Sequence, residues 1–205
     1  MPAPERPERP TRIGIFGGTF DPPHAGHVAA ACAVIEQLGL DRLLLVVAND
    51  PWQKSGQRAV SPAADRFALT EVLAGEISGA EASPLEIERG GPSYSVDTAE
   101  GILAEAGGHP VELLLVIGAD LVPELRSWHR AEDLQRLVSL AIVSRPTGPI
   151  PAVPPGWRAV RVDGPQVPVS SSEVRALLAE GESVDGMVPE AVIQCILRRA
   201  LYAVP

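Results

Sequence analysis

A chain of 205 residues, 45% of them hydrophobic, has enough apolar material for one good core, so we expect a single domain. Its 26 acidic and 17 basic residues give a formal net charge of -9, which argues against a general nucleic-acid binder because a phosphate backbone requires a surplus of Lys and Arg. No apolar run approaches the roughly 20 residues of a membrane span, so we expect no membrane segment.

The N-terminal segment alternates proline with charged residues and lacks an apolar stretch. We therefore predict a disordered tail over residues 1–11, not a signal peptide, followed by one domain over residues 12–205. The two cysteines, Cys32 and Cys195, lie far apart in apolar helical patterns. We interpret both as reduced packing residues, as expected of a protein in the cytoplasm.

Short runs of Val, Ile and Leu recur without alternation, as in strands that are buried on both faces of a parallel sheet. These runs predict strands at Ile13–Phe16, Leu43–Ala48, Leu113–Ile117 and Leu140–Val143. We predict a further strand at Leu85–Glu88 and a last strand at Ala159–Val162. Helical patterns between them are Val28–Leu38, Pro62–Leu73 behind a Ser61 cap, and Val96–Ala106. Because strands alternate with helices, the pattern predicts an α/β fold with a doubly wound parallel sheet.

The C-terminal quarter of the chain follows a Pro/Gly-rich connection, residues 145–156, that we expect on the surface. Ser170 and Glu173 have the spacing of a capping box, which predicts a helix that runs to about Ala179. A closing amphipathic helix is predicted over Pro189–Leu201. Its expected inward residues are Val192, Ile193, Ile196, Leu197 and Leu201.

The stretch GIFGGTFDPPHAGH, residues 14–27, combines features of a phosphate site. Gly17 and Gly18 follow directly on the first strand, where missing side chains let backbone N–H groups approach a phosphate and the next helix dipole favours an anion. His24 and His27 are three residues apart at the helix start, so both rings can face one cleft and donate hydrogen bonds to phosphate oxygens. The alternatives for these histidines are a metal-binding pair and structural helix caps.

The same stretch resembles the HxGH signature of the adenylyl and cytidylyl transferases, whose fold is a Rossmann-like α/β sheet. Further motifs resemble the bacterial nicotinate mononucleotide adenylyltransferases within that superfamily. These are RGGPSYSVDT at residues 89–98, GADLVPELRSW at 118–128, VSRP at 143–146 and SSSEVR at 170–175. The resemblance runs in order from about Ile13 to Tyr202.

The resemblance implies transfer of AMP from ATP, accompanied by Mg²⁺, to nicotinate mononucleotide, with pyrophosphate as the second product. It implies no metal site built from protein side chains alone. The residues it implies for catalysis are His24, His27, Lys54 and Arg175. For ATP binding it implies Gly17, Gly18, Thr19, Phe20, Gly118, Asp120, Ser171 and Ser172, and for the nicotinate end Tyr94, Ser95 and Trp128. Attack by a phosphate oxygen needs positioning and charge neutralisation but no covalent enzyme intermediate.

The sequence departs from the family pattern in the loop ANDPWQKS, residues 48–55. Asp50 puts a carboxylate where phosphates should pass, and Ser95 replaces the usual threonine. Asn49 resembles the residue at this place in the phosphopantetheine adenylyltransferases. Other acceptors, phosphopantetheine or nicotinamide mononucleotide, therefore stay open. A nucleotide-binding sensor without activity is a further alternative because a fold does not fix a function. A homo-oligomer is also left open.

Overall fold

The computed structural model of the protein describes residues 9–51, 60–144, 151–164 and 167–202. Within these ranges, strands form one parallel sheet of six in the order β3-β2-β1-β4-β5-β6. The strands are β1 (Thr11–Gly18), β2 (Arg42–Val47), β3 (Ala80–Ser83), β4 (Val111–Gly118), β5 (Val138–Ser144) and β6 (Ala159–Asp163). The predicted doubly wound, Rossmann-like α/β fold is confirmed. The strand order reverses between β1 and β4, and such a switch point opens a crevice at the carboxyl ends of the two strands.

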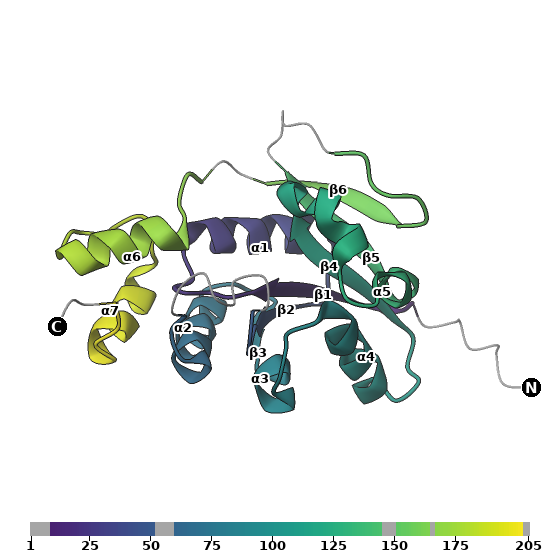
Figure 1. The fold of residues 1–205 in the computed structure, drawn as a ribbon, viewed down its shortest axis with the longest axis horizontal. Coiled ribbons are helices and arrows are strands. Elements are labelled where there is room, and N and C mark those ends of the chain that lie inside the picture. The colour runs from purple at the N-terminus through teal and green to yellow at the C-terminus, as the bar shows by residue number, and fades with distance from the viewer. Residues whose placement is uncertain (1–8, 52–59, 145–150, 165–166, 203–205) are drawn as a thin grey trace, which may run out of the picture.

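Helices cover both faces of the sheet, and Figure 1 shows α1 and α4 on opposite sides of it. One core cluster joins the sheet to α1 (Ala25–Leu38), α2 (Ala63–Gly75), α6 (Ser171–Glu180) and α7 (Glu190–Arg198). The other joins it to α4 (Ser95–Glu105), the 3₁₀ helix η1 (Ala119–Ser127) and α5 (Ala131–Leu137). Two apolar faces, each buried under its own helices, explain why the central strands read as continuous apolar runs.

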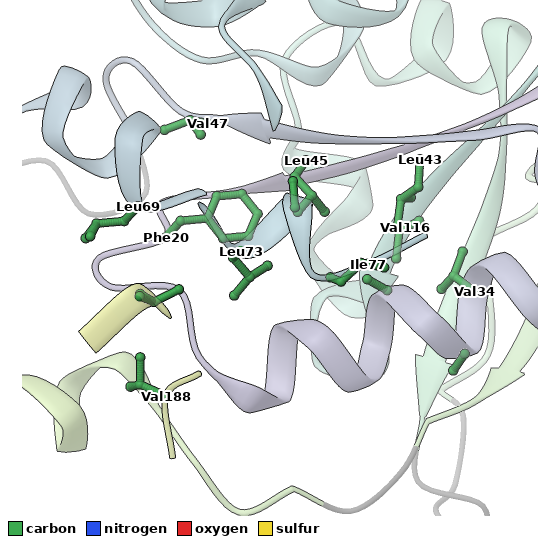
Figure 2. Packing of buried hydrophobic residues seen from close by; sticks show 14 of the residues in the cluster. Phe20, Val34, Leu43, Leu45, Val47, Leu69, Leu73, Ile77, Val116 and Val188 are labelled. Atoms are coloured by element: carbon green, nitrogen blue, oxygen red, sulfur yellow. The ribbon is translucent and has the colours of Figure 1, made fainter. Parts of the chain in front are cut away.

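Phe20 anchors the turn between β1 and α1 in the first core cluster. Its side chain is 1% exposed although its backbone has a positive φ of 49°, an uncommon conformation for a residue with a Cβ. Figure 2 shows the ring beside Leu69 and Leu73 of α2. Burial of an aromatic ring thus holds the chain in this turn just before the two histidines.

Four sequence-based expectations need correction. The segment predicted as a strand at Leu85–Glu88 is the helix α3 (Leu85–Arg89), which begins after Pro84, and the strand lies just before it as β3. Helix α2 begins after Pro62 without the predicted side-chain cap from Ser61. Leu197, expected inward on α7, is 62% exposed.

The fourth correction concerns Cys32, which is exposed on α1, whereas Cys195 is buried as expected; both thiols are free. The N-terminal expectation falls partly outside the described residues, which begin at Arg9. Within them, Arg9 forms an ion pair with Asp41 (2.6 Å), and Thr11 already pairs with Val111 in the sheet. Residues 9–11 therefore already make defined contacts, ahead of the domain start predicted at residue 12.

Candidate active site

A cavity of about 380 Å³ lies at the carboxyl ends of β1 and β4, where the strand order reverses. Among the described residues, its walls bring together Gly17, Gly18, Thr19 and Asp120, expected to bind ATP, with Tyr94, Ser95 and Trp128, expected at the nicotinate end. The first group comes from the end of β1 and from the start of η1, which follows β4, and the second from the start of α4 and the end of η1. One cavity is thus lined by residues predicted for two different substrates.

His24 and His27 form a reciprocal cap at the start of α1. The backbone N–H of Gly26 donates to Nδ1 of His24 (3.1 Å), and the backbone N–H of His24 donates to Nδ1 of His27 (3.1 Å). The ring centroids are 3.9 Å apart. The capping reading of these residues therefore holds, and it is compatible with a ligand role because a neutral imidazole that accepts at Nδ1 carries its proton on Nε2.

This cap explains the glycine between the two histidines. A Cβ on Gly26 would lie 3.0 Å from two atoms of the His24 ring, closer than most carbon contacts allow. Gly18 has a similar task, since a Cβ there would lie 2.8 Å from the Phe20 ring. By contrast, a Cβ on Gly17 would meet no atom within 4 Å, so Gly17 is the position where a missing side chain leaves open space at the cavity.

The electrostatic state of His24 follows from its burial. The side chain is 9% exposed, and burial lowers the pKa of His24 to about 4. The imidazole is therefore neutral at neutral pH. It can donate a hydrogen bond from Nε2 without carrying a full charge.

Residues of α6 reach back to the turn that precedes the histidines. The guanidinium of Arg175 donates to the carbonyl of Asp21 (2.6 Å) and to the hydroxyl of Ser172 (3.1 Å). Ser171 donates its hydroxyl to the carbonyl of Pro22 (2.9 Å). The structure thus brings Arg175, Ser171 and Ser172 together beside the histidine turn.

Other expected ATP contacts are located less directly. The Phe20 side chain belongs to the core, so a contact to ATP from this residue would come from its backbone. At Gly118, a Cβ would lie 2.3 Å from Oδ1 of Asp120, so the glycine leaves room for that carboxylate. Lys54 lies outside the described residues.

An aromatic wall lines one side of the cavity. The ring of Tyr94, the N-cap residue of α4, stacks on the ring of His129 with centroids 4.1 Å apart. Trp128 lines the same wall, and among the described residues its buried indole Nε1 has no hydrogen-bond acceptor. His129 was not predicted from the sequence, although it directly follows the expected Trp128.

The loop after β2 is hydrogen-bonded to the segment that precedes α4. The backbone N–H of Asn49 donates to the Ser93 hydroxyl (2.9 Å), and the Asn49 side-chain amide donates to the carbonyl of Gly91 (2.9 Å). Asp50 accepts from the backbone N–H of Ser93 through its carbonyl (3.1 Å). Asn49 and Asp50, which depart from the family pattern, therefore hold the segment that leads to Tyr94 in the aromatic wall.

Arg66 is a buried arginine that sequence reasoning missed. It is 1% exposed, and its guanidinium donates to the carbonyls of Ser61 (2.8 Å), Thr19 (2.9 Å), Ala48 (2.7 Å) and Asn49 (3.2 Å). These contacts join the loop after β1 to the loop after β2. The helical period offered a signal, since Arg66 lies on the same face of α2 as buried residues three, four and seven positions later.

Glu86 is a second buried polar residue that was missed. It is 6% exposed, lines the cavity, and accepts a hydrogen bond from the hydroxyl of Thr98 (2.6 Å). The sequence offered no sign of this role, because we predicted a strand at Leu85–Glu88 and the alternating pattern did not indicate a contact between α3 and α4. Glu86 thereby connects α3 to α4, the helix that begins at the aromatic wall.

In the described part of the chain, no group of three or more His, Cys, Asp or Glu side chains is arranged to hold a metal ion. Within the same residues, no helix combines the length and apolar character that would let it cross a membrane.

A parallel sheet with a glycine turn at its switch point and a capped histidine pair defines a nucleotide-binding α/β enzyme. The chain belongs to the cytidylyltransferase-like family, whose model matches residues 15–177. Its relatives narrow the class to the nicotinate-nucleotide adenylyltransferases.

Two such relatives illustrate the match. A probable nicotinate-nucleotide adenylyltransferase of Acidothermus cellulolyticus is 34% identical over 199 residues, covering 95% of each chain. A protein of the same name from Streptomyces coelicolor is 38% identical over 189 residues, covering 91% of this chain and 98% of the relative. In fold, the chain is similar to Plasmodium falciparum nicotinic acid mononucleotide adenylyltransferase complexed with NaAD. That structure has a TM-score of 0.73 at 17% identity and matches 94% of this chain and 97% of its own.

Proposed function

We propose that this enzyme transfers the adenylyl group of ATP to nicotinate mononucleotide, giving nicotinate adenine dinucleotide and pyrophosphate. The observation that carries the proposal is the single cavity in which the glycine turn after β1 meets the aromatic wall of Tyr94 and Trp128. A donor nucleotide and a pyridine-bearing acceptor can meet there without leaving the protein. The relatives named above support the same reaction.

The reaction needs one substitution at phosphorus. An oxygen of the acceptor's 5′-phosphate attacks the α-phosphorus of ATP, the bond from that phosphorus to the bridging oxygen of the β-phosphate breaks, and pyrophosphate leaves. The nucleophile is already an anion, so no base has to remove a proton from it. Catalysis then consists of holding the two phosphates in line and stabilising the charge that spreads onto the phosphoryl oxygens.

The residues around the turn suit that task. We assign to His24 and His27 the donation of Nε2–H bonds to the phosphates, because their Nδ1 atoms already accept backbone N–H groups. The positive end of α1 adds a favourable field for the triphosphate. Arg175 supplies a full positive charge beside the same turn.

Mg²⁺ enters this proposal as part of the substrate MgATP. In nucleotide sites this ion keeps several water ligands, and oxygen atoms of the substrate phosphates supply others. The histidines are poor candidates for its ligands, since Mg²⁺ prefers oxygen and both Nδ1 atoms are engaged. The described donor set therefore fits a metal ion that ATP brings with it.

We assign the nicotinate end of the acceptor to the wall of Tyr94, Ser95 and Trp128. Ser95 is the first residue of α4, and the exposed N–H groups of a helix start favour a carboxylate over a neutral amide. An aromatic face from Trp128 suits the pyridine ring. The two free cysteines support a reducing compartment, the cytoplasm, for the enzyme.

The test is pyrophosphate release from ATP and Mg²⁺ with a panel of acceptors: nicotinate mononucleotide, nicotinamide mononucleotide and phosphopantetheine. We expect the first acceptor to exceed the second by at least about tenfold in kcat/KM, the scale of a charge-assisted bond. Equal efficiency would overturn the nicotinate assignment. Binding of ATP without turnover of any acceptor would instead support a sensor.

A further inference from the structure

The C-terminal Tyr202 makes a buried contact with the turn that leads to the histidines. Its hydroxyl donates to Oδ1 of Asp21 (2.9 Å), a residue that is 1% exposed and lies 181 positions earlier in the chain. Burial, followed by the nearby Asp21 carboxylate, raises the pKa of Tyr202 well above its ordinary value. The hydroxyl therefore stays protonated and remains a donor throughout the physiological pH range.

The main chain of the same turn is held by α6. Arg175 donates to the carbonyl of Asp21 (2.6 Å), and Ser171 donates to the carbonyl of Pro22 (2.9 Å). Asp21 is thus fixed twice, through its carbonyl by Arg175 and through its carboxylate by Tyr202. Two elements that are distant in sequence converge on a single residue.

A third contact holds the turn where α1 begins. The backbone N–H of Ala25 donates to the carbonyl of Met187 (2.8 Å), in the segment between α6 and α7. His24 therefore lies between Pro22 and Ala25, both bonded to the C-terminal part of the chain. Since the backbone N–H of Gly26 orients the His24 ring, a shift of the turn moves the Nε2 atom of His24.

We propose that Tyr202 is a positioning residue for adenylyl transfer, whose hydroxyl holds Asp21 and thereby fixes the turn that aims His24 at the substrate phosphates. This inference rests on the proposed function for its kinetic consequence. Its structural part, the orientation of His24, does not depend on any substrate. A misplacement of about 1 Å at a catalytic group is enough to reduce turnover strongly.

A purely structural role for Tyr202 predicts a different result for the Phe variant. In that case the ring only packs against the first core cluster, and Phe would serve equally well. A second anchor of the same region offers a matched control, since Arg199 at the end of α7 forms an ion pair with Asp65 at the start of α2 (2.7 Å). Arg199→Ala loosens the packing of α7 against α2 without touching Asp21.

The kinetic test compares Tyr202→Phe, Asp21→Asn and the double variant with Arg199→Ala. We expect Tyr202→Phe to lower kcat about tenfold, with KM for ATP and for the acceptor changed less than about twofold. The double variant should lose no more than the worse single variant, because both changes weaken the same Tyr202–Asp21 hydrogen bond. Arg199→Ala should keep kcat within about twofold of the wild type.

A substrate-free measurement separates this proposal from the proposed function. Imidazole NMR signals of the ¹⁵N-labelled full-length protein should shift for His24 in Tyr202→Phe and stay in place in Arg199→Ala. Unchanged His24 signals, or a Tyr202→Phe enzyme with wild-type kcat, would overturn the positioning role. A wild-type protein that releases no pyrophosphate with any acceptor would defeat the proposed reaction while leaving the NMR result interpretable.

Discussion

His24 and His27 cap the same helix and each other, with Nδ1 of His27 bound to the backbone N–H of His24. The first ring accepts in turn from Gly26. In neutral imidazoles this arrangement fixes the tautomer that carries hydrogen on Nε2. The HxGH pattern therefore has two consequences: the two side chains cap the helix, and each ring keeps an Nε2–H group that can donate a hydrogen bond.

Separate variants distinguish these two tasks. His24→Ala should cost about 1 kcal/mol of stability through the lost cap and lower kcat by about 10²-fold or more through the lost donor. His24→Asn should recover the stability, because Asn caps helices well, but not the turnover. Denaturation curves and steady-state kinetics measure both; wild-type turnover in His24→Asn would contradict the donor role. His27→Ala should show a similar loss of kcat, and a loss that instead tracked bound zinc would indicate a metal pair.

The lowered pKa of His24 predicts a specific pH dependence of stability. Above the ordinary histidine pKa near 6.5, the residue is neutral in both states and adds no dependence. Between 6.5 and about 4, the unfolded chain binds a proton that the folded chain excludes, so stability falls as the pH falls, by up to about 3 kcal/mol. The difference between wild type and His24→Asn in chemical denaturation isolates this effect. Parallel pH profiles for the two proteins would show that His24 titrates normally.

Gly17→Ala tests the close approach of ATP to the backbone. The new Cβ meets no protein atom within 4 Å, so we expect stability to change by less than about 0.5 kcal/mol. The same methyl group occupies the space that a phosphate needs, and KM for ATP should rise at least about tenfold. Gly75→Ala is the control, since its Cβ also meets nothing but lies at the end of α2. An unchanged KM in Gly17→Ala would place the triphosphate elsewhere.

Arg66→Met should be among the most destabilising single changes in the protein. It leaves the buried carbonyls of Thr19 and Ala48 without this charged donor, and we expect a loss of at least about 3 kcal/mol. Arg42→Met removes an exposed ion pair with Glu81 and should cost less than about 1 kcal/mol. Urea denaturation compares the two variants, and equal losses would show that the buried arginine is dispensable.

Trp128 variants examine the acceptor wall. Trp128→Ala should raise KM for the mononucleotide by about tenfold or more while KM for ATP changes little, because Trp128 lines the side of the cavity that we propose for the acceptor. Trp128→Phe retains an aromatic face but lacks the buried Nε1–H. It should behave nearly like wild type if stacking dominates. A change confined to thermal stability would reassign Trp128 to the core.

The central strands could be predicted because burial on both faces leaves a plain apolar signature, as in Leu113–Ile117. The edge strand β3 could not, since Ala80–Ser83 carries no such run. Leu85–Arg89 was misread because LEIE alternates like a strand, whereas Pro84 in fact precedes a helical turn. Short segments of this kind are decided by tertiary contacts more than by local pattern.

Contacts that follow from local spacing could be predicted from the sequence, whereas contacts between distant residues could not. The histidine pair came from local spacing, and local spacing also sets the reciprocal cap. Arg66, Glu86 and Tyr202 depend on contacts with residues 12 to 181 positions away, which a single sequence does not reveal. Their burial became visible once the fold brought these segments together.

The histidine turn and the aromatic wall lie beside different core clusters of the sheet, and on the proposed function this separation has an evolutionary consequence. The histidine turn leads into α1, whereas the aromatic wall arises from α4 and η1 across the sheet, and the two sides meet at Gly17–Thr19. Mutations in the aromatic wall can therefore alter the proposed acceptor-binding side while the residues of the histidine turn stay unchanged. A fold of this kind lets acceptor specificity evolve through one face of the sheet while the adenylyl-transfer reaction is retained.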